Sequence, residues 1–97
     1  MSSIKEILLE DMKKAMIERS EIPLAAIRTT RAAIKNEEIS KRKDLSDGEV
    51  VEILKREVSL RREARDEYRR LGNDGEAQRL EREISVLEKY LPPENGK

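Results

Sequence analysis

A local excess of cationic side chains is the feature of this 97-residue sequence that most clearly indicates a kind of partner. Between positions 24 and 43 the chain carries six basic residues against two acidic ones. The six are Arg28, Arg31, Lys35, Lys41, Arg42 and Lys43. On a helix that turns by about 100° per residue, the first three fall within about 60° of one another. This spacing predicts a surface for an anionic partner, and the planar guanidinium of arginine suits phosphate in particular.

Some of these cations could instead be paired within the chain. Lys35 has Glu38 three residues further on, which is the spacing of an ion pair on one helix. Arg28 and Arg31 have no acidic residue three or four positions away. The sequence therefore leaves anion binding and a structural role open for this group.

A second arginine cluster, between positions 61 and 70, has a stronger structural interpretation. Glu57 with Arg61, and Asp66 with Arg70, have the spacing of stabilising ion pairs on one helix. Cations in the last turns of a helix also complement the helix dipole. We therefore expect a structural role for this cluster, which consists of Arg61, Arg62, Arg65, Arg69 and Arg70.

The residue types that most enzymes use are missing from the sequence. Histidine and cysteine are both absent, so the commonest metal ligands and general bases are not available. The glycines are isolated and form no phosphate-binding loop. Acidic neighbours such as Glu37 with Glu38, or Glu81 with Glu83, point in different directions on a helix, and we expect them on the solvated surface. The sequence predicts no catalytic residue, no metal and no cofactor.

The overall composition limits the kinds of partner. The chain is 43% charged and has 21 basic and 21 acidic residues, so net charge gives no general attraction to a polyanion. Tyr68 and Tyr90 are the only aromatic residues, so an RNA contact would read backbone and shape instead of stacked bases. The first 17 residues lack the uninterrupted apolar run of a signal peptide or membrane span. We expect a cytoplasmic protein that does not bind membranes.

Apolar residues recur at intervals of three and four in four segments, the pattern of amphipathic helices. The predicted helices span residues 3–19, 23–38, 46–71 and 73–91, with residues 39–44 as a connecting loop. Ser3 with Glu6, and Ser46 with Glu49, have the spacing of capping boxes at helix starts. Because no stripe can be buried alone, the helices must share one core. The sequence predicts an all-α, four-helix bundle-like domain with short loops.

A set of short motifs occurs in one order along essentially the whole chain. They are Ile27-Arg28, Ala32-Ala33-Ile34-Lys35-Asn36-x-Glu38-Ile39, Lys41-Arg42-Lys43-x-Leu45, Asp47-x-Glu49-Val50, Ile53-Leu54 and Glu88-Lys89-Tyr90-Leu91-Pro92. Together they resemble the bacterial YqeY family, and the segment 32–39 is the most specific of them. The resemblance implies that residues 1–92 form the family's N-terminal helical domain, with residues 93–97 as a mobile tail.

The same resemblance implies a second, smaller helical domain, similar to the tail of the B subunit of glutamine-dependent tRNA amidotransferases. That tail is associated with tRNA recognition. This sequence stops just after Tyr90-Leu91-Pro92, where the second domain would begin, so we expect that domain to be absent.

Three hypotheses of function follow. The first is a non-catalytic accessory module that binds tRNA, or an aminoacyl-tRNA synthetase or amidotransferase subunit, through the six cations of residues 28–43. The second is a protein-interaction adaptor with no role in nucleic-acid binding. The third is carbon–nitrogen ligase activity with glutamine as amido-nitrogen donor, which only the resemblance implies. Competition by tRNA separates the first two hypotheses, and thermal stabilisation by glutamine or ATP would favour the third.

Overall fold

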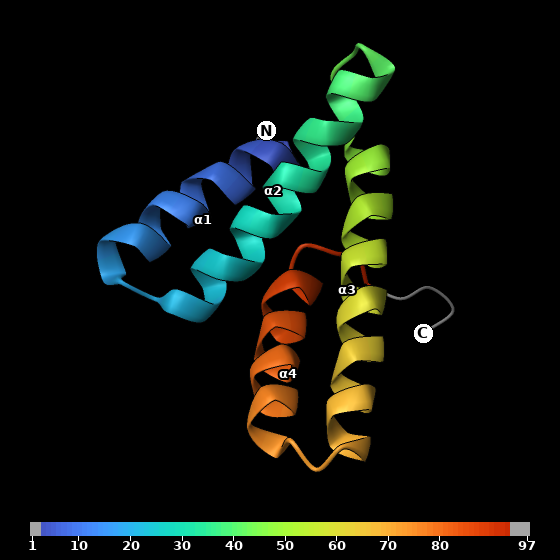
Figure 1. The fold of residues 1–97 in the computed structure, drawn as a ribbon. Helices are drawn as coiled ribbons and strands as arrows, with labels where there is room; N and C mark the ends of the chain where they lie inside the picture. The colour runs from blue at the N-terminus through green and yellow to red at the C-terminus, as the bar shows by residue number, and fades with distance from the viewer. Residues whose placement is uncertain (1–2, 94–97) are drawn as a thin grey trace.

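The computed structural model describes residues 3–93, and this part of the chain forms four helices joined by short loops. They are α1 (Ile4–Glu18), α2 (Glu21–Lys41), α3 (Asp47–Arg70) and α4 (Asp74–Glu88). In Figure 1, α1 and α2 form one helical hairpin, and α3 and α4 form a second hairpin that crosses it. The predicted all-α fold class is confirmed. Across residues 3–93, none of the helices has the length and apolar character needed to cross a membrane.

Side-chain capping begins α1 and α3 at the predicted residues. The backbone N–H of Glu6 donates to Ser3 Oγ at 3.1 Å, and the N–H of Ser3 donates back to Glu6 Oε1 at 2.9 Å. Ser46 and Glu49 make the same reciprocal pair at 3.2 and 2.9 Å. Both predicted capping boxes are therefore confirmed, and each satisfies backbone donors that the first helical turn leaves free.

The second helix differs most from the sequence prediction. It begins two residues before Pro23 and continues to Lys41, so much of the predicted loop 39–44 is helical. Arg42 ends the helix in a left-handed conformation, with φ of 57°. The prediction failed because it treated the loss of an apolar period as the end of the helix. Ile39 is 65% exposed, since this last turn projects beyond the core and has no apolar face to bury.

The third and fourth helices each end before the predicted residue. α3 ends at Arg70, and Gly72 follows with a φ of 79°, the conformation expected of a residue just past a helix end. α4 ends at Glu88 instead of continuing to Leu91. Of the predicted tail 93–97, residues 94–97 lie outside the described residues.

One hydrophobic core lies where the two hairpins pack together. Its buried members are Leu8, Ala26, Ile27, Ile34, Leu45, Val50, Ile53, Leu54, Val58, Ile84 and Leu87. Thr30 of α2 is also fully buried, and its hydroxyl makes no hydrogen bond within the described residues. Each large aliphatic side chain in such a core contributes about 1.5–3 kcal/mol relative to leaving it exposed. All four helices supply residues to this core, so the described residues fold around one centre.

The first helix buries only part of its apolar stripe. Leu8 and Ala15 are buried, whereas Ile7 and Met16 are 40% and 47% exposed. The helix packs against α2 and against α3, and the N–H of Ile4 donates to an Asp47 carboxylate oxygen at 3.0 Å. One side of α1 therefore faces solvent.

A buried ion network joins α3 to α4. Arg61 Nη1 donates to Glu57 Oε1 at 2.8 Å, and Arg61 Nε donates to Glu83 Oε1 at 2.9 Å. The predicted Glu57–Arg61 pair is confirmed. The expected surface position of Glu83 is wrong, because its side chain is 8% exposed and faces the neighbouring helix.

Three other arginines of this cluster, Arg62, Arg65 and Arg70, form pairs nearer the surface. Arg62 pairs with Glu88 at 2.6 Å, and Arg65 with Glu81 at 2.7 Å. The predicted Asp66–Arg70 pair does not form. Its members bind other neighbours, Asp66 contacting Arg65 and Arg70 contacting Glu67. Most arginines of this cluster are thus paired with carboxylates of the second hairpin, which agrees with the structural role predicted for them.

Candidate anion-binding surface

Two of the predicted cations, Arg31 and Lys35, lie on the side of α2 that adjoins α1, and Arg28 shares their helix face one turn before Arg31. Arg28 and Lys35 are exposed, and Arg31 is half-buried with its Nη1 donating to Met12 Sδ at 3.3 Å. Within residues 3–93, no carboxylate comes within ion-pair distance of any of the three. We call Arg28, Arg31 and Lys35 the α2 cationic surface.

Glu38 does not pair with Lys35, although their spacing of three residues allows an ion pair. Its carboxylate instead accepts hydrogen bonds from the ammonium of Lys5 and, at 3.0 Å, from the N–H of Leu45. The bond from Lys5 lowers the pKa of Glu38 most, followed by the bond from Leu45, and the nearby charge of Lys35 adds a smaller part. Glu38 thus connects α1, α2 and the following loop, and Lys35 stays unpaired among the described residues.

The remaining three predicted cations differ from the α2 cationic surface, because two of them are paired with carboxylates. Lys43 lies 3.2 Å from Glu49, and Lys41 lies 3.5 Å from both Glu49 and Glu37. Arg42 is exposed at the end of α2. Two of the six cations are therefore neutralised by neighbouring carboxylates. The Lys41–Glu37 pair has the i, i+4 spacing of one helix, whereas sequence spacing could not show the pairs with Glu49, which belongs to the next helix.

Glu49 gives this loop a testable dependence on pH. The N–H of Ser46 and then the ammonium of Lys43 lower the pKa of Glu49 to about 2. Because the folded pKa lies below the ordinary value of about 4.3, the stabilisation is complete above that pH and is lost as the pH falls towards 2. We expect Glu49→Gln to be less stable than wild type at pH 6, with the difference shrinking at pH 3 in urea unfolding. A difference that stays constant with pH would contradict this.

A groove of about 430 Å³ lies between α1 and α2. Leu8, Leu9 and Ile34 are its apolar lining, and Arg31 and Lys35 line it from α2. Two members of the α2 cationic surface therefore stand beside apolar side chains. Sequence reasoning placed these cations on one helix face but missed the groove, because the groove depends on which helix packs beside α2.

Metal-binding chemistry has no evident place in the described residues. Within 3–93, the acidic residues form no group of three or more that could hold a metal ion. The Glu81 and Glu83 carboxylates are engaged by arginines of α3. The chemistry that this site can perform is binding of an anionic group beside an apolar surface.

Two crossed helical hairpins define a small all-α domain, in which the α2 cationic surface has no ion-pair partner among residues 3–93. A model of the YqeY-like protein family matches residues 5–96, so the chain belongs to the YqeY family. The resemblance drawn from the motifs between Ile27 and Pro92 is confirmed.

Curated relatives extend this finding. The chain is similar to altered inheritance of mitochondria protein 41 of Eremothecium gossypii, with 33% identity over 85 residues, or 87% of this chain. The protein of the same name from Saccharomyces cerevisiae is 30% identical over 86 residues, and that from Lachancea thermotolerans is 29% identical over 85 residues. The match covers 46% of each relative, so the chain spans about half the length of the curated relatives it matches.

These relatives contradict the expected cytoplasmic location, because each is named as a mitochondrial protein. The expectation rested on the absence of a signal-peptide or membrane-span pattern in the first residues. The absence of a signal peptide or membrane span argues only against secretion and membrane insertion. It gives no information about import into an organelle such as the mitochondrion.

Proposed function

We propose that this chain is a non-catalytic accessory module that binds an anionic macromolecule through the α2 cationic surface, with tRNA as the first candidate. The observation that supports it is the lack of an ion-pair partner for Arg28, Arg31 and Lys35 within residues 3–93. Most arginines of α3, in contrast, are paired with carboxylates. The link to tRNA rests on the family's second helical domain, which resembles the tail of an amidotransferase subunit, and not on residues 1–92 themselves. Residues 1–92 would then be one helical domain of that family's architecture.

The physical basis is release of counterions from the RNA backbone. Guanidinium groups can bind phosphate bidentately, and each neutralised phosphate makes the affinity depend more steeply on salt. Three contacts give a slope that corresponds to about a 20- to 40-fold loss of affinity between about 50 and 200 mM salt. Since no base-stacking aromatic side chain lies on this surface, binding should depend little on sequence.

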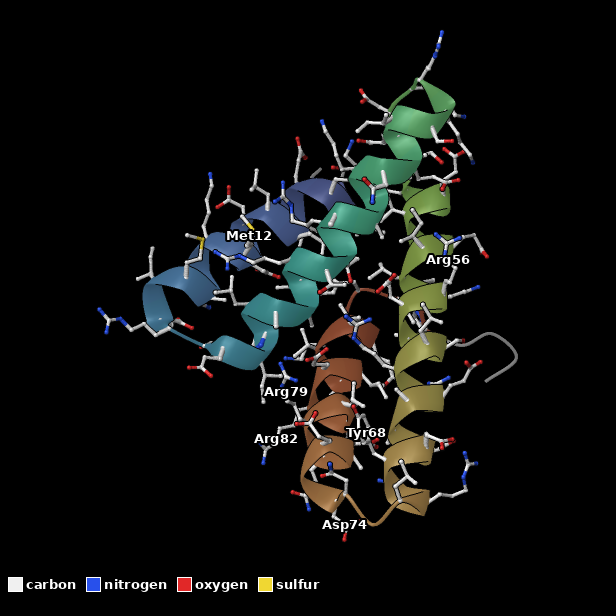
Figure 2. The ribbon with its side chains drawn as sticks, in the orientation of Figure 1. Met12, Arg56, Tyr68, Asp74, Arg79 and Arg82 are labelled. Carbon is white, nitrogen blue, oxygen red and sulfur yellow. The ribbon has the colours of Figure 1, made fainter. Side chains whose placement is uncertain are left out.

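The test is fluorescence anisotropy of labelled bulk tRNA at these two salt concentrations. We expect the triple variant Arg28→Gln, Arg31→Gln and Lys35→Gln to abolish binding and its salt dependence. Figure 2 shows Arg56 and Arg82 on the second hairpin, and both are exposed. Replacing these two and exposed Arg69 with glutamine is the matched control, because it changes the net charge by the same amount. The control should change affinity less than twofold.

Two outcomes would contradict tRNA binding at this surface. One is no binding even at low salt. The other is equal weakening in both triple variants, which would show an effect of net charge alone.

Glu49→Gln offers a separate gain-of-function test. Glutamine can keep the capping box but removes the charge that pairs with Lys41 and Lys43. If the loop cations extend the surface, this variant should bind tRNA more tightly than wild type.

A protein-interaction adaptor is the second candidate, and the α1–α2 groove specifically favours it. Phosphate groups gain no favourable contact with the apolar lining formed by Leu8, Leu9 and Ile34, whereas a protein partner can bury apolar side chains there. On this hypothesis, excess tRNA leaves a complex with the protein partner intact unless the two sites overlap.

A further inference from the structure

We infer that the groove between α1 and α2 is a docking site for an acidic, amphipathic helix of a partner protein. The inference rests on the second candidate function and names the kind of partner. It depends on two features that lie side by side: an apolar stripe along α1 and a cationic stripe along α2.

The apolar stripe consists of Leu9, which lines the groove, and of Met12 and Met16, which continue the same face of α1 past the residues that line the groove. Their spacing of three and four places them on one face of α1. Leu9 and Met12 are half-buried, and Met16 is 47% exposed. Over seven residues the stripe is about 10 Å long, or two helical turns. Methionine is flexible and polarizable, and methionine-rich surfaces suit amphipathic helices of varied sequence.

The contact between Arg31 and Met12 sets the two stripes beside each other, with Arg31 Nη1 3.3 Å from Met12 Sδ. Arg28 and Lys35 lie one turn away on either side of Arg31 along α2. The nearby carboxylate of Glu38 is already occupied by Lys5 and by the loop backbone. Among the described residues, no carboxylate therefore neutralises the α2 cationic surface, and its charges can bind acidic groups of a partner.

Glu6, which lines the groove from α1, also has a partner within the chain. Its carboxylate accepts the backbone N–H of Ser3 in the capping box at the start of α1. Asp44 is at the open end, with its side chain 95% exposed and 4.0 Å from Lys5. The acidic side chains of the groove are thus directed to local partners, which leaves Arg31 and Lys35 available for a ligand.

A helix with apolar residues on one stripe and carboxylates along its flank complements both features. Helix-in-groove recognition uses anchors at i, i+3, i+4 and i+7, and the apolar lining would bury those anchors. Carboxylates on the flank would meet Arg28, Arg31 and Lys35, and arginine can hold a carboxylate through two parallel hydrogen bonds. An RNA backbone would use the cations but not the apolar stripe. The apolar stripe is therefore the feature that favours a protein helix over RNA.

The probe is a displayed library of randomised helices of about five turns, roughly 18 residues, selected on the wild-type protein. We expect enriched sequences to combine an apolar stripe with Asp or Glu along one flank. A synthetic enriched peptide should bind Arg31→Gln/Lys35→Gln at least tenfold more weakly in anisotropy. Met16→Ser should weaken it several-fold, and Arg56→Gln/Arg82→Gln should leave it unchanged. Its shifts in a nitrogen–proton NMR spectrum should concentrate in residues 5–16 and 28–38.

Several results would overturn the inference. These are failure to enrich acidic helices, peptides that bind the Arg31→Gln/Lys35→Gln variant as tightly as wild type, and shifts outside the groove. If no peptide is selected but tRNA shifts the groove amides, the groove belongs to RNA and the first candidate function stands. If neither peptide nor tRNA perturbs α2, the inference and the proposed function both fail.

Discussion

Arg61→Ala should lower the free energy of unfolding by about 3–5 kcal/mol, the range expected when a buried ion pair loses one partner. Arg61, Glu57 and Glu83 are each less than a tenth exposed. Removing the guanidinium leaves two buried carboxylates without their strongest hydrogen-bond donor. Burial alone would lower the pKa of Arg61, but its hydrogen bonds to the two carboxylates outweigh burial and raise the pKa. Urea denaturation followed by circular dichroism measures the loss.

Two further variants make this result specific. Arg62→Ala breaks the Arg62–Glu88 pair, whose side chains are 51% and 42% exposed, and should cost at most about 1 kcal/mol. Replacing Glu57, Arg61 and Glu83 together with apolar residues of similar volume should restore most of the stability, because no buried charge is left unpaired. An Arg61→Ala variant as stable as Arg62→Ala would show that water already screens the network.

The features that the sequence predicted correctly are local ones. Ser46 and Glu49 lie three residues apart, and their capping box depends only on the backbone of one helical turn. The same holds for the Glu57–Arg61 pair, which spans one turn of α3. Interactions of this kind do not require knowledge of which helices are neighbours.

The errors arise where a distant residue competes for a side chain. Lys35 and Glu38 have the spacing of a pair, but Lys5, which is 33 residues from Glu38, takes the carboxylate. Glu83 was expected in solvent, yet Arg61 of the adjacent helix holds it in the interior. Each outcome depends on how the hairpins are formed and crossed, which helical periodicity does not specify.

The candidate site shows the same division. The helical spacing of Arg28, Arg31 and Lys35 predicted a shared face, and the structure places Arg31 and Lys35 of this face beside α1. Whether that face is chemically free depends on long-range pairing. Glu49 neutralises Lys41 and Lys43 but does not reach the three cations further back along α2. The groove itself arises only from the packing of α1 against α2.

Leu8→Ala should be among the most damaging single changes in the first hairpin, with an expected loss of about 2–5 kcal/mol in the free energy of unfolding. Leu8 is fully buried in the core and also lines the α1–α2 groove. Truncation would remove apolar contacts and leave a cavity. Small domains are stable by about 5–15 kcal/mol, so this is a large fraction of the total. Chemical denaturation is again the measurement.

The control for this prediction is Leu60→Ala, because Leu60 is 54% exposed on α3 and should cost no more than about 1 kcal/mol. Polar contacts also hold α1, since Tyr90 donates a hydrogen bond to Asp11 at 2.5 Å, and the N–H of Ile4 donates to Asp47. If those contacts alone fixed α1, Leu8→Ala would be as mild as Leu60→Ala. A large loss confined to Leu8→Ala would instead show that burial of this side chain fixes α1 on the core, and with it the groove that α1 forms with α2.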